Sequence, residues 1–287
     1  MTATPLAGAL RSAAEKLAAA GVDSAGHDAS ALAAHVLGVR PSELAAVAEL
    51  DPADARRYHE LVVRRAQRVP LQHLLGRVGF RYLDLAIGPG AFVPRPETEV
   101  VVQWAVDVLR EADHPLVVDL CTGPGTIALA VANEVPGAEV HAVERDPGAL
   151  AWAERNARER RAAGDTPTTL HLGDITHALT DLDGSVDVVL SNPPYVASGE
   201  HDLVAPEVKD HDPAMALWAG ADGLDVIRLV ESAARRLLRP GGRVAVEHSD
   251  RQGCSAPAVF AAAGCWADIE DHRDLTGRDR FLTATRR

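Results

Sequence analysis

The sequence predicts an α/β fold in which a mostly parallel sheet is covered by helices on both faces, preceded by a small helical bundle. Apolar segments of strand length alternate with helical patterns from about residue 115 to the end of the chain. Most of these segments are continuously apolar, which is typical of strands buried on both faces. Residues 4–75 show helical periodicity only, so the chain divides into a helical part and an alternating part.

Helical patterns fill residues 4–75. The first helix has one apolar face, formed by Leu6, Leu10, Ala14 and Leu17. A second, alanine-rich helix over residues 28–37 ends at Gly38, a residue type that commonly follows helices. Ser42 is the predicted N-cap of a third helix, and an arginine-rich pattern over residues 58–68 predicts a fourth. Together these segments predict a helical bundle.

Glycines punctuate residues 76–93, where partial alternation of apolar side chains predicts a β-hairpin and a linker. A helix over residues 100–109 follows. We therefore expect a helical domain over residues 1–75, a hairpin linker over residues 76–96 and a second domain over residues 97–287.

From residue 115 the two kinds of pattern alternate. Strands are expected at residues 116–120, 140–143, 168–172, 186–191, 243–247, 267–271 and 280–285. Helices are expected at residues 126–133, 147–161 and 223–238. Such alternation is typical of parallel strands joined by helices, whose carboxyl ends form one edge of the sheet and bind ligands there.

The composition argues against several classes of protein. The 287 residues carry a net charge of −12 and are 47% hydrophobic, so a core is expected but a basic nucleic-acid-binding face is not. No apolar run approaches the roughly 20 residues that cross a bilayer, and the first ten residues do not resemble a signal peptide. Three unpatterned cysteines and scattered histidines indicate reduced thiols, no metal site and a cytoplasmic location.

A glycine-containing turn joins the first strand of the alternating part to its helix. It reads Asp119-Leu120-Cys121-Thr122-Gly123-Pro124-Gly125 and lacks both the dinucleotide pattern Gly-x-Gly-x-x-Gly and the lysine of a P-loop. Glu144 ends the next strand, where an acid binds ribose hydroxyls in nucleotide-binding folds, and Asp174 lies near the tip of the strand after it. This acidic edge suits a nucleoside without phosphates, such as cationic S-adenosylmethionine. The alternative is a plain tight turn with Glu144 as a helix cap.

A proline-locked loop, Asn192-Pro193-Pro194-Tyr195, follows the apolar strand at residues 186–191. Two prolines fix the backbone and remove two donors, so this loop presents acceptors. The Asn192 amide oxygen and the Pro193 carbonyl could each accept one N–H of a planar NH2 group, with Tyr195 packed against it. The alternatives are structural, with Asn192 as a turn former and Tyr195 as a core aromatic.

These motifs give the chain a resemblance to the HemK/PrmC family, the release-factor glutamine methyltransferases. Besides Asn-Pro-Pro-Tyr, the similarity rests on four further segments. These are residues 32–38 (Leu-Ala-Ala-His-Val-Leu-Gly), 64–76 (Arg-Arg through Pro-Leu-Gln-His-Leu-Leu-Gly), 92–99 (Phe-Val-Pro-Arg-Pro-Glu-Thr-Glu), and 212–217 (Asp-Pro with Ala-Leu). The chain departs from the family at Cys121, where glycine is usual, and at His73, where tyrosine is usual. It also reads Glu247-His248-Ser249-Asp250 where the family has Glu-His-Gly.

The resemblance implies a Rossmann-like class I methyltransferase domain that uses S-adenosyl-L-methionine, and an N-terminal domain that docks the protein substrate. The substrate would be the glutamine of the Gly-Gly-Gln motif in class I peptide chain release factors. Asn192, Pro193 and Tyr195 would be catalytic, and Pro194 would join them in binding substrate. The cofactor residues would be Asp119, Cys121, Thr122, Gly123, Pro124, Gly125, Glu144, Asp174, Asn192 and Arg95. For Arg95 a loop over the cofactor and a domain-linking salt bridge are both open.

Three other functions stay open at this point. An adenine-specific DNA or RNA amino-methyltransferase shares the Asn-Pro-Pro-Tyr loop, although the acidic charge speaks against it. A non-catalytic binding module would not need the intact acceptor loop. A methyltransferase of another protein or a small metabolite is the third. We expect release factors as partners, no membrane, no direct nucleic-acid contact and a monomer.

Overall fold

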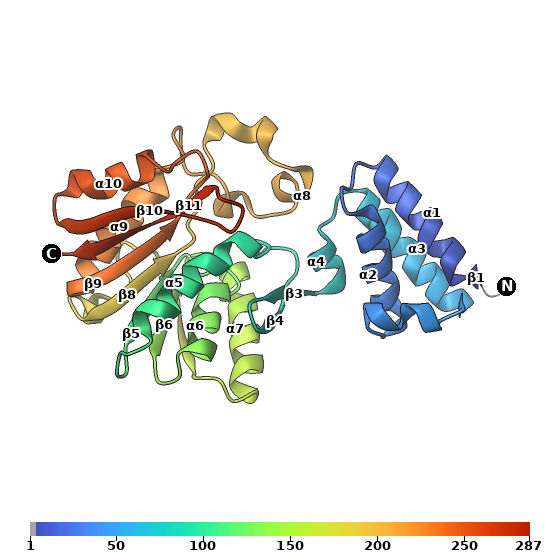
Figure 1. Ribbon diagram of the computed structural model, residues 1–287, viewed down its shortest axis with the longest axis horizontal. Helices are drawn as coiled ribbons and strands as arrows, with labels where there is room; N and C mark the ends of the chain where they lie inside the picture. Colours follow the sequence, from blue (N-terminus) through green and yellow to red (C-terminus); the bar gives the residue numbers. More distant parts are fainter. Residues whose placement is uncertain (1–3) are drawn as a thin grey trace. The chain divides into compact units, whose positions relative to one another are not determined.

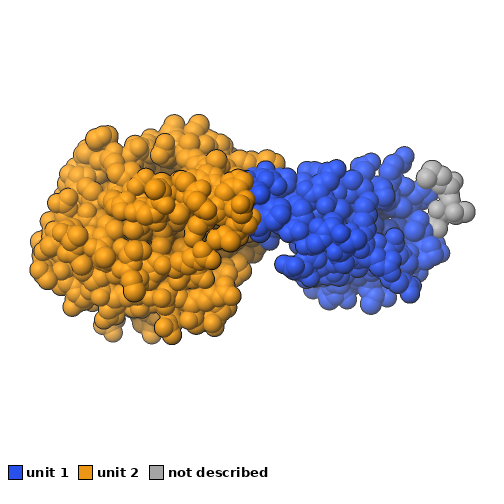
Figure 2. All heavy atoms as spheres, turned by 90° about the horizontal axis from the view of Figure 1, so that it is seen from above, with its two compact units in different colours: residues 1–77, 205–211 blue, residues 78–204, 212–287 orange. Residues whose placement is uncertain are grey.

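The computed structural model describes residues 4–287, which form two compact units (Figure 2). Among the described residues, the first unit comprises residues 4–77 together with Ala205–His211, and the second comprises Val78–Val204 and Asp212–Arg287. No helix in residues 4–287 is both long and apolar enough to span a membrane. The division into a helical unit and an α/β unit follows the change of pattern in the sequence. The expected domain boundaries themselves remain a prediction.

The first unit is built from helices around one apolar core (Figure 1). Its elements are β1 (Thr4–Pro5), α1 (Leu6–Ala19), α2 (Ala25–Leu37), the 3₁₀ helix η1 (Pro41–Ala46), β2 (Glu49–Leu50), α3 (Pro52–Ala66), α4 (Leu71–Leu75) and α8 (Pro206–Lys209). The prediction that Ser42 caps an α-helix is wrong: Arg40 stands at the N-cap of a short 3₁₀ helix, and the α-helix begins after Asp51, whose side chain accepts the N–H groups of Ala53 and Asp54. Ser42 and Asp51 are both of a type that commonly caps helices, and Asp51 is the one that caps an α-helix here.

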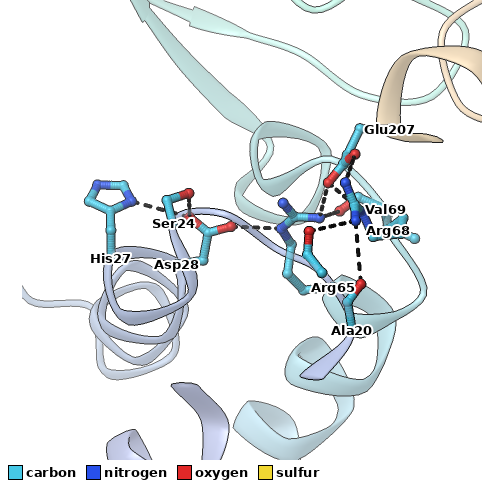
Figure 3. A network of polar contacts seen from close by, with 9 residues as sticks. Ala20, Ser24, His27, Asp28, Arg65, Arg68, Val69 and Glu207 are labelled. Carbon is cyan, nitrogen blue, oxygen red and sulfur yellow. Dashed lines mark hydrogen bonds and ion pairs between the residues drawn. The ribbon is translucent and has the colours of Figure 1, made fainter. Parts of the chain in front are cut away.

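Buried charges pair with one another inside the first unit (Figure 3). Asp28 and Arg65 are both buried, and the Arg65 Nε atom lies 2.7 Å from Asp28 Oδ2. Glu207 accepts hydrogen bonds from both Arg65 and Arg68, at 2.6–3.0 Å. Arg68 also donates to the carbonyl of Gly21. These contacts attach residues 205–211 to the helical unit.

The second unit contains a seven-stranded sheet with the order β10-β11-β9-β8-β5-β6-β7 (Figure 1). Its strands are β5 (Leu116–Leu120), β6 (Glu139–Glu144), β7 (Thr168–Leu172), β8 (Val186–Ser191), β9 (Leu238–Glu247), β10 (Trp266–Arg273) and β11 (Asp279–Arg286). Strands β5 to β9 are parallel, and β11 pairs antiparallel with β9 and β10. The predicted mostly parallel sheet is confirmed. A separate two-stranded sheet pairs β3 (Arg77–Phe80) with β4 (Leu83–Ala86).

Helices cover both faces of the sheet, because neighbouring residues of each strand enter different cores. Val117 packs with α5 (Glu99–Leu109) and α6 (Thr126–Glu134) on one face. Val118 packs with α9 (Asp225–Leu237) and α10 (Ser255–Ala263) on the other. The remaining elements of this unit are α7 (Pro147–Ala162) and the 3₁₀ helices η2 (Pro96–Thr98), η3 (Thr180–Leu182), η4 (Ser198–Leu203) and η5 (Ala214–Ala216).

The strand order reverses beside β5. The chain runs outward from β5 to β6 and β7, then returns to the other side of β5 to form β8 and β9. Such a reversal leaves a crevice at the carboxyl ends of the two strands, which is where open α/β sheets bind their ligands. The tips of β5 and β8 therefore define the candidate site.

Candidate functional site at the carboxyl edge of the sheet

Strand register brings the predicted residues to one edge. Leu120 is paired with Val143 and with Ser191, and Ser191 is paired in turn with Val246. The residues that follow these four are Cys121, Glu144, Asn192 and Glu247. Neighbouring strands lie about 4.8 Å apart, so these four positions form one row along the edge.

The turn after β5 is organised around the buried carboxyl group of Asp119. Its Oδ2 atom accepts hydrogen bonds from the Thr122 hydroxyl at 2.5 Å and from the Ala128 N–H at 3.1 Å. Its Oδ1 atom has no hydrogen-bond partner among the described residues. Burial raises the pKa of Asp119 to about 7, against the lowering effect of these two hydrogen bonds. A buried acceptor without a partner is what a cationic ligand group would complete.

Three residues of this turn have left-handed backbone angles. The φ angles of Cys121, Gly123 and Gly125 are 61°, 57° and 87°. A Cβ atom on Gly125 would lie 3.0 Å from Leu129 and 3.3 Å from the Ala153 methyl group, so glycine also permits close packing of α6 against α7. Cys121 is the exception, since non-glycine residues are disfavoured in this region. The left-handed angle gives a physical reason for the glycine that is usual there in the resembled family.

Glu144 holds two turns together. Its Oε1 atom accepts the N–H groups of Arg145 and Asp146, and Oε2 accepts the N–H of Gly123, all at 2.8 Å. The turn-capping alternative is therefore part of its role. A carboxylate has about four lone-pair positions, so one position on Oε2 is left for a ligand hydroxyl.

The other predicted cofactor residues occupy different parts of the edge. Thr122 also donates its N–H to the Val143 carbonyl, and the Pro124 carbonyl accepts from Asn156. Asp174 lies beyond β7, two strands away from β5, and its carboxylate accepts the N–H and hydroxyl of Thr176. Asp174 is exposed and does not contact the Asp119 turn through any of these bonds.

The Asn-Pro-Pro-Tyr loop starts directly at the tip of β8, with Pro193 buried and Asn192, Pro194 and Tyr195 half-buried. Its backbone is held from outside, because Gln252 donates to the Tyr195 carbonyl at 3.1 Å. A Cβ atom on Gly223, whose φ is 73°, would lie only 2.4 Å from the same carbonyl oxygen. The loop is therefore fixed by packing as well as by its prolines.

Side-chain contacts define the orientation of Asn192 and Tyr195. Asn192 Nδ2 donates to the Thr98 hydroxyl at 3.2 Å, which leaves Oδ1 as the free acceptor of that amide. The Tyr195 hydroxyl donates to Glu247 Oε1 at 3.2 Å. Burial raises the pKa of Tyr195, and the nearby Glu247 carboxylate adds to this effect.

Arg95 is engaged within the second unit. Its guanidinium pairs with Asp212 at 2.8 Å and stacks over the Phe92 ring, 5.0 Å from the centroid. Both partners belong to the same unit as Arg95, so the expectation of a salt bridge linking two domains is not met by this pair. Burial raises the pKa of Asp212 to about 6, which the Arg95 charge opposes.

Sequence reasoning missed Thr98, Glu247 and Gln252 as parts of this site. Thr98 stood inside the Pro-Arg-Pro-Glu-Thr-Glu run that was singled out as a motif. Glu247 is an acid at the last residue of a predicted strand, the same signal that identified Glu144. Nothing local marks Gln252.

The arrangement fits a nucleoside with a cationic amino-acid group. The edge offers an unpartnered Asp119 oxygen, one open position on Glu144 and close backbone at Gly123 and Gly125. Beside it, Asn192 presents a fixed acceptor. One half of the edge can therefore bind such a cofactor while the other half orients an NH2 group.

Comparisons with known proteins show the family to which this chain belongs. A family model described as PrmC N-terminal domain matches residues 8–76, and one described as Methyltransferase small domain matches residues 99–209. A release factor glutamine methyltransferase of Streptomyces coelicolor is 54% identical over 94% of each chain. That of Mycolicibacterium smegmatis is 47% identical over 99% of this chain and 98% of its own.

Two further similarities concern the acceptor and the fold. A 4-amino-L-phenylalanine/4-methylamino-L-phenylalanine methyltransferase of Streptomyces pristinaespiralis is 41% identical over 99% of this chain and 96% of its own. The solved structure of a Thermus thermophilus 16S rRNA N2 G1207 methyltransferase with AdoMet and guanosine covers 74% of this chain and 50% of that one. Its TM-score is 0.53 and its identity 18%, a likeness of fold alone.

Proposed function

Because the chain belongs to the release factor glutamine methyltransferase family, we propose that it methylates the side-chain amide nitrogen of the glutamine in the Gly-Gly-Gln motif of class I peptide chain release factors. The observation that carries this proposal is the 54% identity to a release factor glutamine methyltransferase over 94% of both chains. The acceptor geometry of Asn192 supports it independently, since its amide oxygen is the group left free to bind an NH2.

We propose S-adenosyl-L-methionine as the cofactor, which when bound supplies an electrophilic methyl group on a sulfonium sulfur. Asp119, Thr122, Gly123 and Gly125 would hold its amino-acid part, and Glu144 its ribose. Cys121, Pro124, Asp174 and Arg95 complete the proposed cofactor residues. Asp174 is included because it lies at the same sheet edge. Arg95 is included because it directly precedes η2, whose residue Thr98 contacts Asn192 at that edge.

The residues of the acceptor loop would act by orientation. A carboxamide nitrogen is a poor nucleophile because its lone pair is delocalised into the carbonyl. Asn192 Oδ1 and the Pro193 carbonyl would each accept one N–H, with Pro194 and Tyr195 closing the pocket around the planar amide. Fixing a nucleophile in line with the bond to be broken can lower a barrier by roughly 7–11 kcal/mol. The N–CH3 bond forms as the S–CH3 bond breaks, and one N–H proton is then lost to solvent.

The helical unit would dock the release factor. The strand tips and the glycine turn of the candidate cofactor site all belong to the second unit. This supports a role for the helical unit in docking the substrate and not in binding the cofactor. Release factors act in translation, so we expect the protein to work in the cytoplasm. We also expect a monomer, which sedimentation of the purified protein tests.

A small-molecule aromatic amine is the second candidate acceptor. The observation that favours it is the aminophenylalanine methyltransferase at 41% identity, which matches 99% of this chain. Since that relative spans both units, the presence of a helical unit does not decide between a protein and an amino acid as substrate.

One assay separates these acceptors. Purified protein and labelled S-adenosylmethionine are incubated with an intact class I release factor, with 4-amino-L-phenylalanine and with duplex DNA. We expect label on the release factor alone, and mass spectrometry should place it on the Gly-Gly-Gln glutamine. Faster transfer to the amino acid would replace the proposed function with the second candidate, and transfer to DNA would replace it with an adenine methyltransferase. A release factor with Gly-Gly-Ala in the motif is the matched control.

A further inference from the structure

One buried side-chain amide joins three segments at the carboxyl edge, and the mechanism above gives it no role. Gln252 lies just before α10 and is 7% exposed. Its Nε2 atom donates to the carbonyl groups of Tyr195, Gly223 and Asp222, at 3.1, 3.2 and 3.3 Å. Its Oε1 atom accepts the N–H of Ser249 at 3.0 Å. The amide therefore connects the acceptor loop with the turn that follows β9 and the turn that precedes α9.

The neighbours of this amide determine its orientation. Three carbonyl oxygens surround the nitrogen and a backbone N–H faces the oxygen, so the reversed amide would set an acceptor against three acceptors. The backbone N–H of Gln252 also donates to the Ser249 carbonyl, at 2.8 Å. Two hydrogen bonds between these two residues thus close the turn, and the NH2 group of Gln252 is presented from a fixed position.

The acceptor loop is held at both ends, and Gln252 acts at its exit. Strand β8 fixes the entry, and the two prolines fix their own φ angles. Beyond Tyr195, the Val196 N–H donates to the Leu217 carbonyl, and the Val196 carbonyl accepts from Ala219, both at 2.9 Å. The Tyr195 carbonyl lies between the prolines and this bridge, and it accepts from Gln252. Without Gln252 the peptide after Tyr195 would lose the side-chain donor that fixes its carbonyl.

Gly223 also closely approaches this carbonyl. Its φ is 73°, and a Cβ atom there would collide with the Tyr195 carbonyl oxygen and lie 2.7 Å from Gln252 Nε2. Any side chain at this position would displace the carbonyl, the amide or both. The contact between Gln252 and the acceptor loop thus depends on two residues that can be changed separately.

The cofactor half of the edge has a buried amide of its own. Asn156 on α7 is fully buried, and its Nδ2 atom donates to the carbonyl groups of Ala86 and Pro124, both at 3.0 Å. Pro124 belongs to the glycine-containing turn, whereas the Nε2 atom of Gln252 donates to the acceptor loop and to the turn before α9. The two amides therefore support different halves of the candidate site.

We propose that Gln252 is a positioning residue for methyl transfer, which holds the Tyr195 carbonyl against the Gly223 turn and so keeps the acceptor loop where it orients the NH2 group. The inference rests on the proposed function for the role of that loop, but it applies to any NH2 acceptor bound there. Gln252 touches neither substrate nor cofactor in this role. Its effect should appear in the rate of transfer, and binding of the cofactor at the Asp119 turn should not change.

The first test compares Gln252→Met and Asn156→Ala with the parent protein. Met keeps the length of the Gln252 side chain but cannot donate, so kcat should fall at least about tenfold, because a displacement of about 1 Å can cost 10²-fold in rate. The Kd for the cofactor, measured by calorimetry, should stay within about threefold. Asn156→Ala should raise that Kd more than it lowers kcat. Gln252→Met would overturn the proposal if it weakened cofactor binding as much as it slowed transfer. So would an Asn156→Ala variant with the same loss of kcat and unchanged cofactor binding.

A second test uses pH to restore the hydrogen bond. In Gln252→Glu a carboxylate would face three carbonyl oxygens and could not donate, whereas a protonated carboxyl group could donate one O–H. Burial among acceptors favours the protonated form. The rate relative to the parent should therefore rise as the pH falls from about 9 to about 6. The relative rate of Gln252→Met should not change over that range, and a pH-independent ratio for Gln252→Glu would contradict the role of the donor.

Hydrogen exchange gives a measurement that does not depend on activity. In Gln252→Met, amide exchange in a peptide covering residues 195–203 should become faster, because the exit of the loop opens more often. Unchanged exchange in that peptide would show that Gln252 does not hold the loop. Should Gln252→Met not fold, Gly223→Ala perturbs the same contact, and it should lower kcat at least about tenfold with the cofactor Kd retained. A parent-like kcat in Gly223→Ala would then overturn the proposal.

A control separates positioning from a general loss of stability. Trp266 is buried in the same unit and donates to Glu231 at 2.9 Å, so Trp266→Phe removes a buried hydrogen bond that does not involve the edge. It should unfold at a lower temperature than the parent, with kcat and loop exchange like the parent's. An equal loss of kcat in Trp266→Phe would show that the effect of Gln252→Met is only structural. All variants are scored with whichever acceptor the parent methylates, so failure to methylate release factors counts against the proposed function alone.

Discussion

The two units both bury acids, but they treat them in opposite ways. In the helical unit the buried Asp28 and the partly buried Glu207 each pair with an arginine, at 2.7 Å and 2.6 Å. At the sheet edge, Asp119 and Glu247 each retain an oxygen that has no hydrogen-bond partner within residues 4–287, and burial raises the pKa of both to about 7. Paired acids hold a structure together, whereas a buried acid with an open acceptor marks a candidate ligand site.

Backbone strain shows the same contrast. Arg68 has a φ of 68° at the end of α3, and its side chain is held by Glu207 and the Gly21 carbonyl. Cys121 also has a left-handed φ angle, 61°, at the sheet edge. Left-handed angles cost on the order of 1–2 kcal/mol for non-glycine residues. In the helical unit several hydrogen bonds offset that cost directly.

The largest effect should follow from breaking the paired charges. Arg65→Met removes the arginine partner of Asp28, a residue that is 2% exposed and whose other carboxylate oxygen contacts Ser24 and His27. Removing one member of a buried ion pair costs about 3–5 kcal/mol, because the other charge remains buried without its counter-ion. Urea unfolding followed by circular dichroism should show this loss in the transition of the helical unit.

Arg64→Met is the matched control, since Arg64 is exposed on the same helix. Its free energy of unfolding should change by no more than about 0.5 kcal/mol. A loss below about 1 kcal/mol in Arg65→Met would mean that the paired charges of this unit are not structural, and the contrast with the sheet edge would fail.

The next effect concerns the sheet edge. Asn192→Ala removes an oriented acceptor, so kcat should fall on the order of 10²-fold or more while cofactor affinity changes little. Asn192→Asp keeps an acceptor but adds negative charge, so cofactor affinity should rise while transfer stays slow. Single-turnover methylation and calorimetry on the same preparations measure both quantities. Transfer by Asn192→Ala within a few-fold of the parent would contradict the acceptor-loop mechanism.

A smaller effect depends on pH. Burial raises the pKa of Glu207, but hydrogen bonds from Arg68 and Arg65 outweigh it, so its pKa lies below the usual value. The carboxylate therefore stabilises the folded state above the unfolded-chain pKa of about 4.3, and this stabilisation is lost as the pH falls through the lower folded-state value. The difference in free energy of unfolding between the parent and Glu207→Gln should be largest at pH 7 and shrink below about pH 4. A difference independent of pH would show that the charge of Glu207 is not what stabilises the unit.

The smallest effect tests strain at the edge. Cys121→Gly relieves a left-handed angle but increases the flexibility of the unfolded chain, so the two effects nearly offset each other. We expect a change between zero and about 1 kcal/mol of added stability. The control is Cys265→Gly, because Cys265 is also half-buried but has no positive φ. Thermal unfolding should show a loss in that control, and an equal loss in both variants would contradict strain at Cys121.

Local pattern predicted the sheet well where a strand is continuously apolar. Strands β5 and β8 have the predicted bounds, because each apolar run is flanked by turn residues. Strand β7 also has the predicted bounds, although its sequence Thr-Thr-Leu-His-Leu is only partly apolar. Strand β9 begins earlier than predicted, at Leu238, since the Pro-Gly-Gly segment was interpreted as a loop. The ladder explains this: Val186 pairs with Leu238 and Val188 with Arg243, so residues 239–242 form an irregular excursion within the strand.

Helix α10 was not predicted, and a proline is the reason. Pro257 lies in its first turn, where the missing N–H would have no partner in the helix anyway. In the sequence the same proline interrupts an alanine-rich pattern and hides it. Residues 205–211 were assigned to the second domain by position along the chain. Their contacts with Arg65 and Arg68 span about 140 residues, which no local pattern encodes.

The candidate site divides in the same way. Residues recognisable by type and by place at a strand tip, such as Glu144 and Asn192, were predicted. The link from Asn192 to Thr98 spans 94 residues and depends on how η2 packs against the sheet edge. The link from Tyr195 to Glu247 spans 52 residues and depends on β8 and β9 becoming neighbours. The sequence predicts the tips, and the register between β8 and β9 decides which tips touch.

The unpartnered oxygen of Asp119 has a thermodynamic consequence for the cofactor. A carboxyl group whose pKa burial raises to about 7 is partly protonated at neutral pH. A cationic group bound beside it favours the ionised form, so cofactor binding should expel that proton into the buffer. The observed heat of binding would then depend on the ionisation enthalpy of the buffer, and affinity would increase as the pH rises through neutrality. The protein would thus exchange a proton for its methyl donor, which links methylation capacity to the acidity of its surroundings.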